Sequence, residues 1–248
     1  MQDSRETHCA HSGCTHFRGL LEERGVALSG ITLLVVGSGD GTEAAYFAGH
    51  EAAVTALDPS PQASDPQDPG IEFLRARLED DAGPARLFDL IFCYHVLEHM
   101  ENPRRALLLM RERLAPWGWL YLGTPNRSRV LGYLGSSDVT IADKVRWNLT
   151  DWRRRLAGTF RNELGAHAGF ARRELLQMAE ERFESVEDVT IDYIRRKYAT
   201  VPSLVTDAIT SCPAVFNHVT PAFYMLCQKR PRAAAPVADD RSADDEGL

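Results

Sequence analysis

Two histidines and a glutamate follow an apolar run in the middle of the chain. His95, Glu98 and His99 form an H-x-x-E-H pattern directly after residues 88–94. Because imidazole titrates near neutral pH, His95 and His99 are candidates for a general base that takes a proton from an acceptor. The alternative is structural, with either histidine satisfied at the end of a strand or at the start of a helix.

A glycine-rich segment lies after an earlier apolar run. Residues 37–41 read G-S-G-D-G, between the run at 31–36 and a helical stretch at 42–49. Glycine lets a ligand approach the backbone where a side chain would collide, and the start of the next helix offers free N–H groups. The segment is therefore a candidate ligand-binding turn, although a single glycine motif is weak evidence.

An acid ends the next apolar run. Asp58 follows residues 52–57 and lies about 20 residues after Gly37, where nucleotide-binding folds place their ribose-binding acid. A carboxylate at this position can accept hydrogen bonds from both hydroxyls of an adenosine ribose. The alternative is a turn residue before Pro59.

The glycine spacing discriminates between two nucleotides. A dinucleotide site favours G-x-G-x-x-G, with the pyrophosphate at the helix start, whereas this chain has G-x-G-x-G. Asp40 and Glu43 add negative charge that is unfavourable beside a pyrophosphate but acceptable beside an ammonium and a sulfonium. The pattern favours S-adenosylmethionine as cofactor and disfavours an NAD-dependent oxidoreductase.

Strands and helices are expected to alternate over residues 17–125, which predicts a parallel sheet covered on both faces. Helical periodicity and capping residues define the expected helices. We expect strands at 31–36, 52–57, 71–76, 88–94, 119–123, 185–194 and 223–229, and helices at 17–24, 42–49, 102–114 and 171–182.

The expected domain organisation follows from where the alternation of strands and helices stops. We expect an N-terminal arm and helix at 1–30, flexible up to about residue 16, a catalytic domain at 31–230, and a disordered tail at 231–248. Insertions at 126–168 and 195–221 are expected to form a lid over the substrate.

The two insertions are rich in basic and aromatic residues. These could hold an anionic or aromatic substrate by charge and stacking, or they could be solvated helix faces. The residues concerned are Lys144, Arg146, Trp147, Trp152, Arg153, Arg154, Arg155, Phe160 and Arg161, followed by Arg195, Arg196, Lys197 and Tyr198.

The composition limits the kinds of molecule that this protein is expected to bind. The net charge of -7 over 248 residues argues against a general nucleic-acid binder. No apolar run approaches the roughly 20 residues that span a bilayer, and the polar N-terminus lacks the core of a signal peptide. We therefore expect a cytoplasmic protein with a small-molecule substrate, no membrane partner and reduced cysteines.

Cysteines and histidines gather near the N-terminus. They suggest either a zinc site or a mobile polar arm, and the lack of a second pair at finger-like spacing favours the arm. The residues are His8, Cys9, His11, Cys14 and His16.

Taken in order, these motifs resemble those of the class I S-adenosylmethionine-dependent methyltransferases. The resemblance covers residues 31–126 and resumes at 167–176 and 223–228. Its words are V-G-S-G-D-G at 36–41, L-D-P-S at 57–60, F-D-L-I-F-C-Y-H-V-L-E-H at 88–99, L-A-P-W-G-W-L at 114–120 and G-T-P-N at 123–126. Trp117 replaces a glycine that the family commonly has.

The resemblance implies a fold and a set of roles. It implies a Rossmann-like, doubly wound α/β fold whose seven-stranded sheet has its last strand antiparallel. Ligands bind such sheets at the carboxyl ends of the strands. The resemblance further implies that Gly37, Ser38 and Gly39 approach the methionine part of S-adenosylmethionine, and that Asp58, beside Pro59, holds its ribose. Glu79 or Asp80 is implied to bind the adenine amino group. Tyr94 and His95 are implied to face the sulfonium and the substrate.

A metal is a second implication of the resemblance. Ubiquinone-pathway O-methyltransferases and small-RNA 2′-O-methyltransferases carry a similar E-x-x-E-H word that can bind a divalent metal, and here His95 replaces the first glutamate. His95, Glu98, His99 and His167 are the candidate ligands, a set that suits zinc, iron or manganese better than magnesium. Non-metal relatives also carry the equivalent of Glu98 and His99.

The leading hypothesis is methyl transfer to an oxygen or nitrogen atom of a small molecule, in natural-product or cofactor biosynthesis. The alternatives are an RNA 2′-O-methyltransferase-like enzyme with a metal at the His/Glu cluster, and a non-catalytic nucleotide-binding module. The acceptor residues lie in insertions without a readable motif, so the sequence does not name the acceptor.

Overall fold

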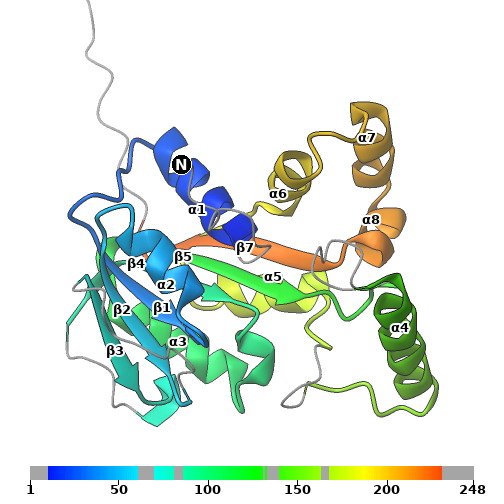
Figure 1. The fold of residues 1–248 in the computed structure, drawn as a ribbon, viewed down its shortest axis with the longest axis horizontal. Coiled ribbons are helices and arrows are strands. Elements are labelled where there is room, and N and C mark those ends of the chain that lie inside the picture. Colours follow the sequence, from blue (N-terminus) through cyan, green and yellow to red (C-terminus); the bar gives the residue numbers. More distant parts are fainter. Residues whose placement is uncertain are drawn as a thin grey trace, which may run out of the picture.

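A single sheet of seven strands forms the centre of the molecule in the computed structural model, which describes residues 11–60, 70–80, 86–130, 132, 140–162 and 168–230 (Figure 1). The strand order is β3-β2-β1-β4-β5-β7-β6. The strands are β1 (Thr32–Val36), β2 (Ala53–Asp58), β3 (Ile71–Arg75), β4 (Phe88–Tyr94), β5 (Leu114–Pro125), β6 (Ser185–Asp188) and β7 (Ala222–Gln228).

The strand directions match the predicted fold. The pairs β1–β2, β1–β4, β2–β3 and β4–β5 are parallel, whereas β7 is antiparallel to both of its neighbours, β5 and β6. The strand order reverses between β1 and β4, which opens a crevice at their carboxyl ends. The doubly wound, Rossmann-like class with its last strand antiparallel is therefore confirmed.

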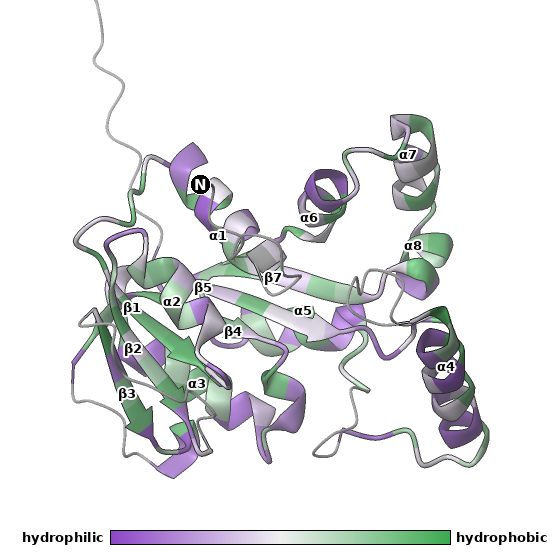
Figure 2. Cartoon of the chain, viewed as in Figure 1, coloured by the Kyte–Doolittle hydropathy of each residue, from purple (hydrophilic) through white to green (hydrophobic). Residues whose placement is uncertain are grey.

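Helices cover both faces of this sheet, and apolar colour is concentrated in the central strands (Figure 2). Side chains of α1 and α2 pack on one face and those of α3 and α5 on the other, while α6 contributes Tyr193 to the first cluster and Ile194 to the second. The helices are α1 (His11–Glu23), α2 (Thr42–Ala48), α3 (Pro103–Arg113), α4 (Ile141–Leu156), α5 (Arg172–Glu180), α6 (Thr190–Lys197), α7 (Ser203–Ser211) and α8 (Pro213–Val219), with the 3-10 turns η1 (Leu78–Asp80) and η2 (Leu97–His99).

Local sequence explains where these elements begin. Leu33 to Val36 are all buried, because both faces of β1 are covered by helices. The side chain of Asn102 caps α3 by accepting from the backbone N–H of Arg105 at 3.0 Å, and Pro103 fills the first helical turn, as predicted.

The N-terminal helix starts earlier than the sequence suggested. The expectation of a flexible arm up to residue 16 is wrong for residues 11–16, because α1 begins at His11 and turns Cys14 and His16 into the core. His16 Nδ1 lies 2.8 Å from the hydroxyl of Tyr121, and His16 Nε2 lies 2.9 Å from Asp192 Oδ2. Cys14 and His16 thus fix α1 to the sheet, while His8 and Cys9, two of the zinc candidates, lie outside the described residues.

The strand expected at 185–194 is shorter than predicted. β6 ends at Asp188, whose Oδ1 accepts from the backbone N–H of Thr190 at 3.0 Å, and this local turn leads from the strand into α6. Thr190, Tyr193 and Ile194 are the buried residues of this helix. Their spacing of three and four residues is helical, so the second half of this stretch was wrongly assigned to a strand.

The predicted insertions are helical. Residues 126–168 contain α4, and residues 195–221 contain α7 and α8. Their role as a substrate lid remains a prediction, and the tail expected at 231–248 lies outside the described residues. Among the helices that the structure describes, none combines the length and the hydrophobicity needed to cross a bilayer.

The buried His16 connects stability to pH. Burial lowers the pKa of His16 below its ordinary value of 6.5 and outweighs the attraction of Asp192. Below that pH the unfolded chain binds a proton that the folded chain does not, so the free energy of unfolding falls as the pH falls. We expect the urea midpoint to fall between about pH 7.5 and about pH 5.5, and to fall less in His16→Gln. His50→Gln, at a half-buried surface position, is the control, and a His16→Gln profile parallel to wild type would contradict the prediction.

Candidate functional site

The glycine turn after β1 packs directly on the segment after β4. Gly37 has a φ of +74°, and a Cβ at this residue would lie 2.3 Å from Val96 Cγ2. Gly39 has a φ of +49°, and nothing lies within 4 Å of the position that its Cβ would take. The turn is therefore closed on the Val96 side and open at Gly39, where a ligand can approach the backbone.

Asp58 faces this turn from the end of β2. Its Oδ2 accepts from the backbone N–H of Gly39 at 3.0 Å, and its Oδ1 accepts from that of Ser60 at 2.7 Å. An ionised carboxylate offers about four acceptor positions, so capacity remains for the two hydroxyls of a ribose. Pro59 is exposed beside it and directs the chain away from the strand.

Ser38 provides an independent test of whether a ligand fits the turn. The residue is 1% exposed, and its hydroxyl oxygen has no hydrogen-bond partner within the described part of the chain. A buried hydroxyl without a partner is unfavourable unless a ligand supplies one. The open backbone at Gly39, the carboxylate of Asp58 and this hydroxyl together fit the polar amino-acid and ribose groups of S-adenosylmethionine.

The two acids predicted to read adenine follow β3. Glu79 and Asp80 lie in η1, and β3 is the neighbour of β2, so both residues lie toward the same carboxyl edge as Asp58. Glu79 is half-buried and Asp80 is exposed. Their contact with adenine remains a prediction.

His95 has an unusual backbone at the end of β4. Its φ is +55°, in the left-handed region that few non-glycine residues adopt, and its N–H donates to the carbonyl of Gly123 at 2.8 Å. Such conformations cost free energy and cluster at functional sites. This bend turns the chain out of the sheet and places Val96 against Gly37.

The predicted His/Glu cluster is assembled around a buried carboxylate. Glu98 Oε1 lies 3.7 Å from His95 Nδ1 and 3.9 Å from His99 Nε2, and its Oε2 accepts from the hydroxyl of Thr124 at 3.2 Å. The Glu98 side chain is fully buried, whereas both histidines are partly exposed. The buried carboxylate thus lies between the two imidazole rings, slightly beyond hydrogen-bonding distance of each.

The metal hypothesis is not supported by the described residues. They contain no group of three or more His, Cys, Asp or Glu side chains that could hold a metal ion. The fourth candidate, His167, lies outside the described residues. We therefore derive no step through a metal.

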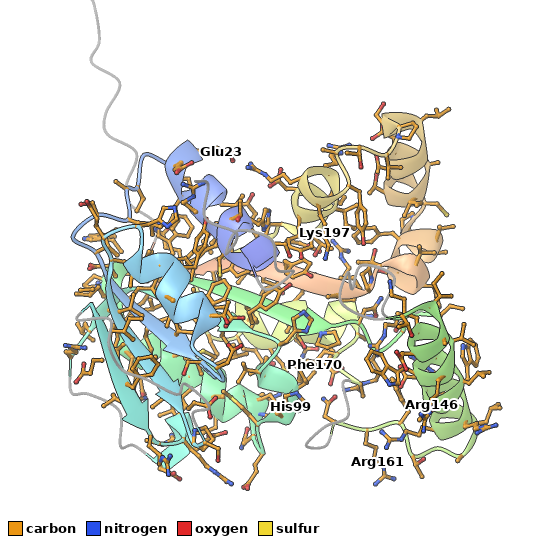
Figure 3. All side chains as sticks on the ribbon, viewed as in Figure 1. Glu23, His99, Arg146, Arg161, Phe170 and Lys197 are labelled. Atoms are coloured by element: carbon orange, nitrogen blue, oxygen red, sulfur yellow. The ribbon has the colours of Figure 1, made fainter. Side chains whose placement is uncertain are left out.

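Tyr94 belongs to a cluster of hydroxyl groups that the sequence did not reveal. Its hydroxyl lies 3.3 Å from that of Tyr193 on α6, which in turn lies 2.7 Å from Ser12 Oγ on α1. The ring of Tyr193 stacks on Tyr224 with 3.8 Å between the ring centroids, and Lys197, which is labelled in Figure 3, donates to the Tyr193 hydroxyl at 3.4 Å. Burial raises the pKa of Tyr94, and its charge coupling to Tyr193 adds to this, so Tyr94 keeps its proton at neutral pH.

Sequence reasoning missed Tyr193 because it lay in a stretch assigned to a strand. The helical spacing of Thr190, Tyr193 and Ile194 was the signal that could have placed it on α6. Ser12 was missed because it fell in the expected flexible arm. Of this cluster, only Tyr94 and Lys197 were candidates from the sequence.

Two of the basic residues of the insertions make contacts that serve the structure. Arg155 lies over the ring of Phe160 at 4.1 Å and donates to the carbonyl of Arg129 at 3.0 Å. Arg195 pairs with Asp207 on α7 at 3.1 Å. Arg146 lies on α4, away from His99 in the view of Figure 3. For these residues the structure gives more support to packing and solvation than to substrate contact.

These features define a class of protein. A glycine turn after β1, an acid at the end of β2, and one antiparallel strand at β7 are the marks of an α/β fold that binds S-adenosylmethionine. The methyltransferase domain family matches residues 5–182, and the chain belongs to this family of class I S-adenosylmethionine-dependent methyltransferases.

Curated relatives are similar to part of the chain. The mitochondrial ubiquinone biosynthesis O-methyltransferase of Schizosaccharomyces pombe is 32% identical over 152 residues, which cover 57% of this chain and 54% of that protein. The ubiquinone biosynthesis O-methyltransferase of Coxiella burnetii is 31% identical over 113 residues, covering 43% of this chain and 48% of that protein. The chain thus spans about half the length of these relatives.

Solved structures share the fold. The plantazolicin methyltransferase BpumL, crystallised with a triazolic desmethylPZN analog and SAH, aligns with a TM-score of 0.61 and 16% identity, covering 92% of this chain and 88% of that one. The 1,6-didemethyltoxoflavin-N1-methyltransferase of Burkholderia thailandensis, with bound 1,6-didemethyltoxoflavin and S-adenosylhomocysteine, has a TM-score of 0.52 and 17% identity, covering 88% of this chain and 78% of that one.

Changing the acid at the end of β2 tests the cofactor site. Asp58→Asn keeps an oxygen that can accept from Gly39 but removes the negative charge and one acceptor oxygen. We expect calorimetry to show affinity for S-adenosylmethionine reduced about tenfold or more, because hydrogen bonds to a charged group are the stronger ones. Glu112→Gln, which removes the same charge from the exposed side of α3, is the control. Unchanged affinity in Asp58→Asn would exclude this carboxylate from the cofactor site.

Ser38→Ala separates a ligand contact from a structural one. Because the hydroxyl has no hydrogen-bond partner among the described residues, its removal should leave the urea midpoint of the ligand-free protein unchanged or slightly higher. Affinity for S-adenosylmethionine should fall about threefold to tenfold, as expected for one hydrogen bond. A loss of stability without a loss of affinity would show that Ser38 serves the fold alone.

Proposed function

We propose that this protein transfers the methyl group of S-adenosylmethionine to an oxygen or nitrogen atom of a small, aromatic or anionic molecule in natural-product or cofactor biosynthesis. The observation that carries the proposal is the contact of Gly37 with Val96. Through it, the glycine turn and the His95–Glu98 pair lie at one edge of the sheet.

The residues at this edge would each contact a different part of S-adenosylmethionine. Gly37, Ser38 and Gly39 would hold the methionine part, Asp58 with Pro59 the ribose, and Glu79 or Asp80 the adenine. Tyr94 and His95 would border the sulfonium. Bound S-adenosylmethionine supplies an electrophilic methyl carbon, so the protein has to align the acceptor and receive its proton.

His95 is suited to receive that proton. Its Nδ1 faces the buried carboxylate of Glu98 at 3.7 Å, which leaves the second ring nitrogen for the acceptor. The hydrogen bond from Thr124 holds that carboxylate in place. His99 faces the same oxygen of Glu98 from the other side, and it is the second candidate base.

The hydroxyl cluster of Tyr94 and Tyr193 is suited to bind the acceptor molecule. Neutral phenols donate hydrogen bonds to an acceptor oxygen, stacked rings favour a planar molecule, and the Lys197 ammonium favours an anionic one. The relatives' names support the acceptor class, since they are small-molecule O-methyltransferases, and two structural neighbours carry a desmethylPZN analog and a didemethyltoxoflavin. None of these names supports the RNA alternative.

The proposal is tested with a labelled methyl donor and a panel of phenols, aromatic carboxylates and heteroaromatic amines, read out by product mass. His95→Asn is the informative variant, because asparagine tolerates the left-handed backbone. We expect kcat to fall about 100-fold or more while affinity for S-adenosylmethionine stays unchanged.

His218→Asn, an exposed histidine on α8, is the matched control. Full activity of His95→Asn would exclude His95 as the base, and His99→Asn would then be examined. Methylation of RNA but of no molecule in the panel would overturn the proposed acceptor class.

A further inference from the structure

Helix α4 presents an apolar stripe to solvent. Ile141, Val145, Leu149, Trp152 and Leu156 are 81%, 54%, 54%, 41% and 85% exposed, and no residue of the helix is buried. Their spacing of four, four, three and four residues places them within an arc of about 80° on the helix surface. An apolar face of this size on an exposed helix indicates an interaction surface.

Basic residues border the stripe. Arg146 and Arg153 follow it along one side, and Lys144 and Arg155 along the other. The helix carries five basic residues against two acidic ones. Of these acids, Asp143 accepts from the hydroxyl of Thr140, which in turn accepts from the backbone N–H of Asp143, and Asp151 pairs with Arg129 at 3.0 Å. The charge that α4 offers to a partner is therefore cationic.

One margin of the stripe is anchored to the domain. Asn148, next to this margin, exchanges hydrogen bonds with the backbone of Gly132 at 2.7 and 3.1 Å, and the indole of Trp152, the stripe residue at the margin, donates to the carbonyl of Val130 at 3.1 Å. These polar bonds hold the helix in place, and the other residues of the stripe stay exposed.

The apolar surface continues onto α8. Val130 is exposed beside Trp152, and its N–H donates to the carbonyl of His218, the neighbour of the exposed Val219. Figure 1 shows α4 and α8 along the same outer edge of the molecule. The stripe and this extension form one surface, which we call the α4 face.

We propose that the α4 face binds an anionic phospholipid surface, with α4 lying in the plane of the interface. An apolar stripe with bordering Lys and Arg, and with tryptophan at its margin, is the pattern of interfacial helices. A second copy would bring its own cationic borders against these. In a chain of net charge -7, a helix of net charge +3 also orients the protein, because an anionic surface attracts α4 and repels the remainder.

The test is co-sedimentation of the full chain with vesicles of phosphatidylcholine alone and with about one-third phosphatidylglycerol. We expect binding to the anionic vesicles, a blue shift of tryptophan fluorescence, and release when salt rises from about 0.1 M to about 0.5 M. Leu149→Ser combined with Leu156→Ser should lower the partition coefficient at least tenfold, and Arg146→Glu combined with Arg153→Glu should abolish the preference for anionic lipid.

Trp117→Ser is the matched control, since Trp117 is 51% exposed near the amino end of β5, and its partition should equal that of wild type. Because no α4 residue is buried, the helix variants should keep the wild-type urea midpoint. The proposal is overturned by absence of binding, by equal binding to neutral vesicles, by unchanged binding of the leucine variant, or by a dimer in light scattering that the leucine variant loses.

Discussion

The end of β1 and the end of β4 meet because residue 37 has no side chain. A Cβ at Gly37 would overlap Val96, so any larger residue would separate the turn that is proposed to hold the cofactor from the segment that carries His95 and Glu98. Both segments leave the sheet at the point where the strand order reverses, which is the one crevice that the topology itself creates. The left-handed backbone of His95 is the matching feature on the other side of this contact.

Around that contact lie two carboxylates that are held by hydrogen bonds and two histidines that are partly exposed. Asp58 is held by two backbone N–H groups, and Glu98 is buried and held by Thr124, so neither carboxylate needs to reorganise when a ligand binds. The proposed acid–base role falls to the partly exposed histidines beside Glu98, because the glycine turn has no side chain that could receive a proton.

The sequence was informative where one local cause fixes the structure. Residues 31–36 and 88–94 are apolar because both faces of a central parallel strand are covered, and few other structures produce such a short apolar run. Asp58 and the glycine turn could be placed because each follows such a strand. The start of α1 and the boundary at Asp188 could not be placed in this way. His16 is buried only because Tyr121 and Asp192 supply partners from more than 100 residues away, and α6 begins after a turn in which Asp188 accepts from the N–H of Thr190.

The same reasoning separates the two insertions from the core. The edge of the sheet is specified by close contacts, such as Gly37 with Val96 and Asp58 with Gly39, that tolerate little change. Helix α4 is held instead by a few polar bonds to residues 129–132 and buries no side chain, so its outer face is free to vary without cost to the core. An apolar stripe on such a face gains nothing for folding, because it stays in water in the folded chain. Its alignment over the length of the helix, with cationic borders, is therefore explained by what the helix meets outside the molecule, and this is the reason to assign it a partner rather than a place in the core.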